Sequence, residues 1–181
     1  MMDFLRSKIT QEERARAIVE LEEGQRLRGW IANSYAQIEF LLGDLILRCR
    51  EFPEYANCPP ALPHGAPDRV KRVRQIIALG GPLSLFANDL TGMIERFENG
   101  HETRNLLAHG FCEYLYTADG DTGLQFQKWH RMPDRQDARL IRCFRIADLQ
   151  TEKESFSMLA DEVLGLYWRM QDHFNWVARP D

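Results

Sequence analysis

The sequence predicts a mainly helical fold, a bundle of about five helices with a small three-stranded antiparallel β-meander inserted before the last helix. Two observations predict this class. Apolar residues recur at spacings of three and four over long stretches of the chain, which is typical of amphipathic helices. Strand-forming residues in a period-two pattern are confined to residues 111–146. We find no internal repeat, low-complexity tract or second domain, so residues 1–181 are interpreted as one domain.

The first third of the chain predicts two helices and a loop. A capping-box pattern at residues 10–13 predicts a helix that ends near Gly24. A second helix is expected over residues 28–51, and its apolar stripe comprises Ile31, Tyr35, Ile38, Leu41, Leu42, Leu45, Ile46 and Cys49. Five prolines follow, so residues 53–67 are expected to form an irregular loop, either a lid or docking loop or a disordered connection.

The middle of the chain predicts two shorter helices. A basic helix over residues 68–79 is expected to stop at Gly80-Gly81-Pro82. A helix over residues 84–98 carries apolar residues at helical spacing, and Asn99-Gly100 is expected to bend or break it.

The pattern then changes to strands before the last helix. Strands are expected over residues 111–117, 123–130 and 139–146, with a hairpin turn at Asp119-Gly120 between the first two. A second capping-box pattern, Thr151–Glu154, predicts the start of the closing helix. The apolar stripe of that helix comprises Phe156, Leu159, Val163, Leu166, Tyr167, Met170 and Phe174.

The charge balance limits the class of partner. A formal net charge of −4 and a pI near 5.8 argue against a constitutively strong nucleic-acid binder. Basic residues are nevertheless clustered, and each cluster is either a solvated face or a groove that follows phosphates. The first cluster comprises Arg69, Lys71, Arg72 and Arg74, and the second comprises Arg131, Arg135, Arg139, Arg142 and Arg145.

Hydropathy and cysteine spacing indicate a cytoplasmic protein. No apolar run approaches the roughly 18 residues that a membrane span needs, and the N-terminus lacks a signal-peptide core. The four cysteines have no spacing typical of zinc, which favours free thiols in a reducing compartment. We expect neither a metal nor a cofactor. The cysteines are Cys49, Cys58, Cys112 and Cys143.

The strongest functional signal is the segment Arg104-Asn105-Leu106-Leu107-Ala108-His109, which Gly110 follows. An arginine can stabilise a phosphate anion, and a histidine can move protons near neutral pH. Gly110 is expected to end a helix, which places His109 in the last turn, where the helix dipole favours a cation.

The position of Arg104 on the helix raises a geometric problem. If the helix through Phe97 continued, Arg104 would share its apolar face, where a guanidinium needs an anion or a cleft. His109 lies five residues further, about 140° around a regular helix. Either the helix is distorted, or a second chain completes the site.

This segment, at the end of a helix in a small bundle, resembles the signature of the HEPN superfamily, and the helical layout is similar over residues 10–110. The resemblance implies a metal-independent ribonuclease that pairs two motifs across a homodimer to build one composite cleft. Arg104 would stabilise the phosphorane, His109 would act as acid or base, and Asn105 would orient one of them or bond the phosphate. The strand-rich segment is not part of the minimal fold of the superfamily.

Four other groups could take part in function, but a structural role is favoured for each. His101-Glu102 is favoured as an exposed helix start over a second proton carrier. Trp129 and Trp168 are favoured as core residues over base-stacking residues. The carboxylates favoured as surface or turn groups are Glu39, Asp44, Asp119 and Asp121.

Three functions stay open. The first is a metal-independent endoribonuclease that cleaves RNA by attack of the 2′-hydroxyl, in the setting of a toxin or defence effector held down by an inhibitory protein partner. The second is a non-catalytic HEPN-like module that binds a nucleotide, RNA or protein through Arg104 and the basic helix. The third is an accessory bundle in which the motif merely ties a helix end to the sheet.

Overall fold

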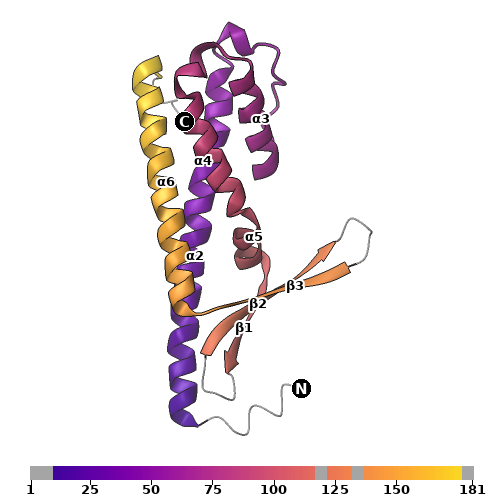
Figure 1. Ribbon diagram of the computed structural model, residues 1–181, viewed down its shortest axis with the longest axis vertical. Coiled ribbons are helices and arrows are strands. Elements are labelled where there is room, and N and C mark those ends of the chain that lie inside the picture. The colour runs from indigo at the N-terminus through magenta and orange to yellow at the C-terminus, as the bar shows by residue number, and fades with distance from the viewer. Residues whose placement is uncertain (1–9, 117–121, 132–136, 177–181) are drawn as a thin grey trace. The chain divides into compact units, whose positions relative to one another are not determined.

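The computed structural model describes residues 10–116, 122–131 and 137–176 (Figure 1). Five α-helices lie in these residues: α2 (Gln11–Cys49), α3 (Ala66–Ala78), α4 (Ala87–Asn99), α5 (His101–His109) and α6 (Ile146–Phe174). The other elements are the 3-10 helices η1 (Pro53–Tyr55) and η2 (Gly81–Phe86) and the strands β1 (Phe111–Tyr116), β2 (Thr122–Arg131) and β3 (Asp137–Phe144). The predicted class, mainly helical with an antiparallel sheet before the last helix, is confirmed.

The chain divides into two compact units. Unit 1 comprises the chain up to Ala32 together with Glu102–Glu154, and unit 2 comprises Asn33–His101 together with the chain from Ser155 onward. Helices α2 and α6 each contribute to both units. No helix of the described residues combines the length and the apolar character that crossing a bilayer requires.

The capping box at the start of α2 is formed as predicted. The hydroxyl of Thr10 accepts a hydrogen bond from the Glu13 amide (3.2 Å), and the Glu13 carboxylate accepts one from the Thr10 amide (2.8 Å). The predicted helix end at Gly24 is wrong, because α2 continues to Cys49. Gly24 is buried, and a Cβ there would lie 2.0 Å from Cδ1 of Leu124. Close packing against the sheet therefore explains this glycine, and a helix end does not.

The sheet of unit 1 is the predicted meander, with strand order β1-β2-β3 and antiparallel pairing throughout (Figure 1). Phe111 pairs with Gln127, and Trp129 pairs with Arg139. Because side chains alternate along a strand, these residues share one face of the sheet. The opposite face carries the buried residues Leu124, Phe126 and Phe144. The predicted turn at Asp119-Gly120 lies outside the described residues.

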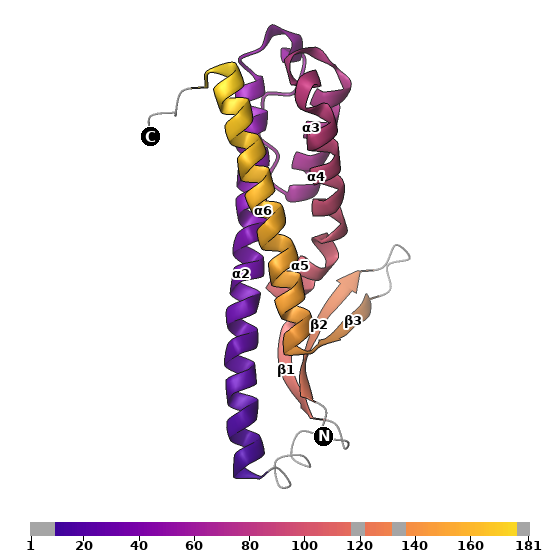
Figure 2. The same cartoon turned by 60° about the vertical axis from the view of Figure 1, so that its left-hand side comes forward.

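Unit 2 is a small helical bundle in which α6 runs beside α2 (Figure 2). The predicted stripes are buried except at Phe174, which is partly buried, and each large buried side chain contributes about 1.5–3 kcal/mol relative to exposure. The stripe of α2 in this unit comprises Tyr35, Ile38, Leu41, Leu42, Leu45, Ile46 and Cys49. The stripe of α6 comprises Phe156, Leu159, Val163, Leu166, Tyr167 and Met170.

The proline-rich segment is more regular than predicted. Pro53–Tyr55 form η1, and α3 begins at Ala66 with Pro67 in its first turn, where the missing amide donor costs nothing. Tyr55 is buried, donating to the Gly80 carbonyl (2.7 Å) and accepting from the Leu83 amide (2.9 Å). A buried tyrosine thus fixes one end of this segment.

The predicted start of the last helix at Thr151 is also wrong, because α6 begins at Ile146. The Asp148 carboxylate accepts a hydrogen bond from the Arg145 amide (2.8 Å), which caps the true N-terminus. The Thr151 hydroxyl instead donates to the Ala147 carbonyl one turn back (3.0 Å). A hydroxyl that bonds within the helix cannot mark its start.

Candidate functional site

The segment with the strongest functional signal forms α5, a helix separate from α4. The break falls at Asn99-Gly100, as predicted. A Cβ at Gly100 would lie 2.3 Å from the ring of Phe156, so close packing explains the glycine at this break. The helix through Phe97 therefore does not continue to Arg104, so the condition under which the two side chains would share a face is not met.

Arg104 and Asn105 are brought together. Arg104 is partly buried, and its Nη1 donates a hydrogen bond to Oδ1 of Asn105 (2.9 Å). The Nε atom of Arg104 is shut off from solvent. The amide side chain thus holds one edge of the guanidinium, which leaves the arginine less free to move than a solvated one.

His109 lies in the last turn of α5 and is exposed. The helix ends at Gly110 as predicted, but Gly110 does not adopt the left-handed conformation. It is a glycine because a Cβ would lie 2.4 Å from the carbonyl oxygen of Leu106, to which its amide donates (2.7 Å). Arg28 of α2 donates to the neighbouring Ala108 carbonyl (3.0 Å). The turn that carries the imidazole is therefore anchored at two carbonyls.

The two predicted catalytic side chains do not lie on the same side of α5. The segment is α-helical from His101 to His109, so a five-residue separation places Arg104 and His109 about 140° apart. Their different burial agrees with this, since Arg104 is partly buried and His109 is exposed. The segment forms a regular helix, so helix distortion does not bring Arg104 and His109 together.

The pair at the start of α5 divides between the two units. In unit 1, exposed Glu102 accepts a hydrogen bond from Nη2 of Arg142 on β3 (2.6 Å). In unit 2, His101 is partly buried, and its Nδ1 lies 2.5 Å from the hydroxyl of Tyr35. The Tyr35 ring stacks on Phe97, with centroids 4.1 Å apart. The prediction of an exposed pair is therefore correct for Glu102 and wrong for His101.

An exposed aromatic patch lies on the face of the sheet opposite the buried residues Leu124, Phe126 and Phe144. Phe111 is 58% exposed and Trp129 is 72% exposed. They share a hollow of about 240 Å³, whose lining comprises Phe111, Gln127, Lys128, Trp129 and Arg139. We call these five residues the sheet patch. It belongs to unit 1, as does α5 from Glu102 onward, and β1 begins two residues after His109.

The core role predicted for both tryptophans is wrong. Trp129 shares the β2 face of Gln125 and Gln127, opposite buried Phe126, and Trp168 of α6 is exposed. The period-two pattern of β2 was the signal that could have revealed this, because a residue three positions from a buried one lies on the other face.

The predicted RNA-binding residues of α3 are largely engaged within unit 2. Arg69 donates to the carbonyl of Pro63 (2.9 Å), and Arg72 donates to that of Pro59, so both hold the proline-rich segment. Arg74 forms an ion pair with Glu98 (2.5 Å). Lys71 is exposed.

The two carboxylates of α2 have partners in unit 2. Glu39 lies 3.8 Å from Nη1 of Arg69. Asp44 accepts hydrogen bonds from the hydroxyl of Tyr167 and from Nε of Arg48 (3.4 Å). Burial, and then the bond to Asp44, raise the pKa of Tyr167 to about 12.

The four cysteines are free thiols. Burial raises the pKa of Cys49 to about 12 and also raises that of Cys112. Within the described ranges, no three His, Cys, Asp or Glu side chains are grouped to hold a metal ion. Asp119, Asp121 and Arg135 lie outside those ranges.

Comparison with protein families, with curated proteins and with solved structures finds no match for this chain.

Proposed function

We propose that this chain is a metal-independent endoribonuclease of HEPN type, with His109, Arg104 and Asn105 as its catalytic residues. The observation that carries the proposal is the accessible imidazole of His109, in an anchored helix end that leads directly into the sheet patch. Single-stranded RNA is the substrate class that suits the residues around His109 and the sheet patch. Bases stack on exposed aromatic rings, and arginine and lysine attract the phosphates.

The proposed reaction uses the RNA as its own nucleophile. The 2′-oxygen attacks the adjacent phosphorus while a base takes its proton, and the bond from phosphorus to the 5′-oxygen breaks as an acid protonates that oxygen. The products are a 2′,3′-cyclic phosphate and a 5′-hydroxyl. His109 performs one of the two proton transfers, and Arg104, oriented by Asn105, stabilises the anionic phosphorane. A second copy of the chain supplies the group that completes the cleft, because 140° separates the two side chains.

Cleavage of a labelled single-stranded RNA by the purified chain in EDTA tests the proposal. The expected products carry 2′,3′-cyclic phosphate ends, and His109→Ala should lower the rate by about 10²- to 10⁴-fold. His64→Ala, at an exposed histidine of unit 2, is the matched control and should leave the rate unchanged. Unfolding temperatures should stay the same in both variants, because both side chains are exposed. Cleavage that persists in His109→Ala would refute the assignment.

A non-catalytic RNA-binding module is the second candidate, and the separation of Arg104 from His109 around α5 favours it. Binding needs the sheet patch and a fixed guanidinium, but no pair of proton carriers. In that case Arg104→Ala would weaken RNA binding, and no cyclic phosphate ends would form with any variant.

A further inference from the structure

Helices α4 and α6 carry matching sequences, contrary to the expectation of no internal repeat. Residues 85–99 read LFANDLTGMIERFEN, and residues 158–172 read MLADEVLGLYWRMQD. Aligned without gaps, the two segments share an alanine, a glycine and an arginine, and most other positions pair apolar with apolar or acidic with acidic or amide residues. So few identities make the repeat hard to see without the contacts that pair the helices.

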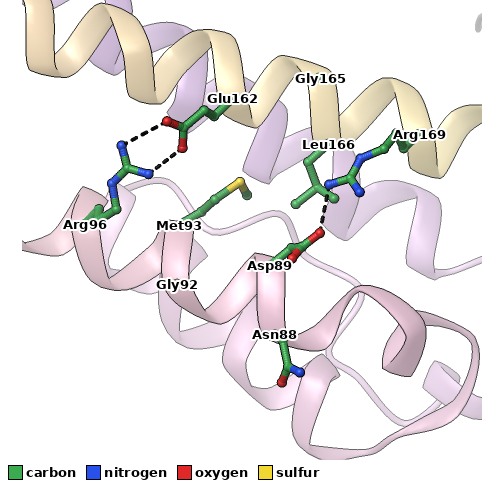
Figure 3. Close-up of a pocket in the computed structure, with 9 residues that line it drawn as sticks. All are labelled: Asn88, Asp89, Gly92, Met93, Arg96, Glu162, Gly165, Leu166 and Arg169. Carbon is green, nitrogen blue, oxygen red and sulfur yellow. Dashed lines mark hydrogen bonds and ion pairs between the residues drawn. The ribbon is translucent and has the colours of Figure 1, made fainter.

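The two segments pair with each other antiparallel in unit 2 (Figure 3). Asp89 of α4 accepts a hydrogen bond from Nη2 of Arg169 of α6 (2.8 Å). Arg96 of α4 holds both carboxylate oxygens of Glu162 of α6. The acidic residue of each segment therefore pairs with the arginine of the other segment: Asp89 with Arg169, and Glu162 with Arg96. The two helical segments are therefore related by a local two-fold axis, which passes between the equivalent glycines Gly92 and Gly165.

Those glycines, Gly92 and Gly165, are not required by packing within the chain. A Cβ at either position would meet no described atom within 4 Å. A glycine inside a helix costs about 0.8–1 kcal/mol relative to alanine. Both line a hollow of about 630 Å³ between the two ion pairs, floored by Met93 and Leu166. The hollow leaves space for close approach from outside the chain.

The four charges around this hollow alternate in sign. In order around it they are Asp89, Arg169, Glu162 and Arg96. A second copy turned by 180° about an axis in this face, parallel or perpendicular to the helices, places every carboxylate opposite an arginine. This face is therefore complementary to itself, as the interface of a two-fold dimer must be.

We propose that the face formed by α4 and α6 binds the same face of a second copy of this chain. Met158 of α6 is 60% exposed and lies seven residues before Gly165, about 20° away around the helix, so it adds apolar area to this face. A partner of unrelated sequence would explain neither the repeat nor the alternation of charge. The interface uses no residue of α5, so it is independent of the proposed ribonuclease.

Sedimentation of the full chain across a dilution series tests this interface. We expect a dimer for the natural chain and a monomer for Gly92→Arg and Gly165→Arg, because each new side chain projects into the interface. Gly29→Arg is the matched control, since its Cβ also meets nothing within 4 Å but it lies in the part of α2 that belongs to unit 1. Circular dichroism should show the same helix content in all three variants. A monomeric natural chain, or dimers of Gly92→Arg and Gly165→Arg, would overturn the proposal.

Reversing the four charges gives a second test. The variant with Asp89→Arg, Arg96→Glu, Glu162→Arg and Arg169→Asp keeps both ion pairs within the chain and keeps the alternation. We expect it to dimerise with itself and not with the natural chain, because mixing sets like charges opposite each other. Energy transfer between labelled chains measures this exchange. Mixed dimers that form as readily as matched ones would overturn the interface, whereas RNA cleavage that persists in His109→Ala would refute the ribonuclease and leave this result unchanged.

Discussion

Gly110, which follows the last residue of α5, is a position where one added methyl group should be costly. In Gly110→Ala the new Cβ would lie 2.4 Å from the carbonyl oxygen of Leu106, about 1 Å short of ordinary van der Waals contact. The obstacle is backbone and cannot rotate away. The same oxygen accepts the hydrogen bond from the Gly110 amide (2.7 Å), so relieving the clash stretches that bond.

The magnitude follows from these contacts. A lost backbone hydrogen bond costs about 0.5–1.5 kcal/mol, and forced overpacking costs about 1–3 kcal/mol. The smaller conformational entropy of unfolded alanine returns about 0.4–1 kcal/mol. We expect a net loss of about 1–3 kcal/mol, and each kcal/mol lowers the unfolding temperature of a chain of this size by about 2–4 °C. RNA cleavage should fall as well, because His109 is the adjacent residue.

Gly29→Ala makes the same chemical change but should shift the stability in the opposite direction. Gly29 lies inside α2, and a Cβ there would meet nothing within 4 Å. Better helix propensity should raise stability by about 0.8–1 kcal/mol. Thermal unfolding of both variants and the natural chain, followed by circular dichroism, measures the difference. If Gly110→Ala melts at or above the natural chain, the proposed clash with the Leu106 carbonyl is wrong.

The remaining predictions concern the sheet patch and the thiols. Trp129→Ala in a His109→Ala background should weaken binding of a single-stranded RNA oligonucleotide by about 1–3 kcal/mol, or about 5- to 150-fold. Phe40→Ala, at a similarly exposed aromatic (70%) of unit 2, should not change it, and equal losses would contradict base stacking at the sheet. At about pH 8, iodoacetamide should modify exposed Cys143 and spare Cys49 in the folded protein, because the thiolate reacts and burial raises the Cys49 pKa to about 12. Mass spectrometry that finds Cys49 alkylated at the same rate would contradict its burial.

The sequence predicted those features that depend on long periodic patterns. The stripes of α2 and α6 and the three-stranded meander follow from burial, which imposes its period on many residues at once. Short local signals failed where tertiary contacts compete with them. Gly24 reads as a helix end but is required by Leu124 of the sheet, and Thr151 reads as a cap but bonds back into α6. Leu124 is far from Gly24 in sequence, whereas the Thr151 bond is a local one within α6.

The candidate site was predictable in part. The end of α5 at Gly110 followed from glycine chemistry, although its cause is a close approach and not a left-handed turn. The direction of Arg104 could not be extrapolated from Phe97, because the packing of Gly100 on Phe156 lies at the break between α4 and α5. The α4 and α6 repeat became visible through its ion pairs, since these pair the acidic residue of each segment with the arginine of the other.

The two units are each assembled from stretches far apart in the chain, and this has a consequence for synthesis. Unit 1 needs Glu102–Glu154 before the first part of α2 can pack, and unit 2 needs the chain beyond Ser155. On a ribosome that adds about 5–20 residues per second, the first part of α2 therefore waits for several seconds before the strands of unit 1 are made. We therefore expect truncation near the C-terminus to prevent unit 2 from assembling, whatever reaction the finished protein performs.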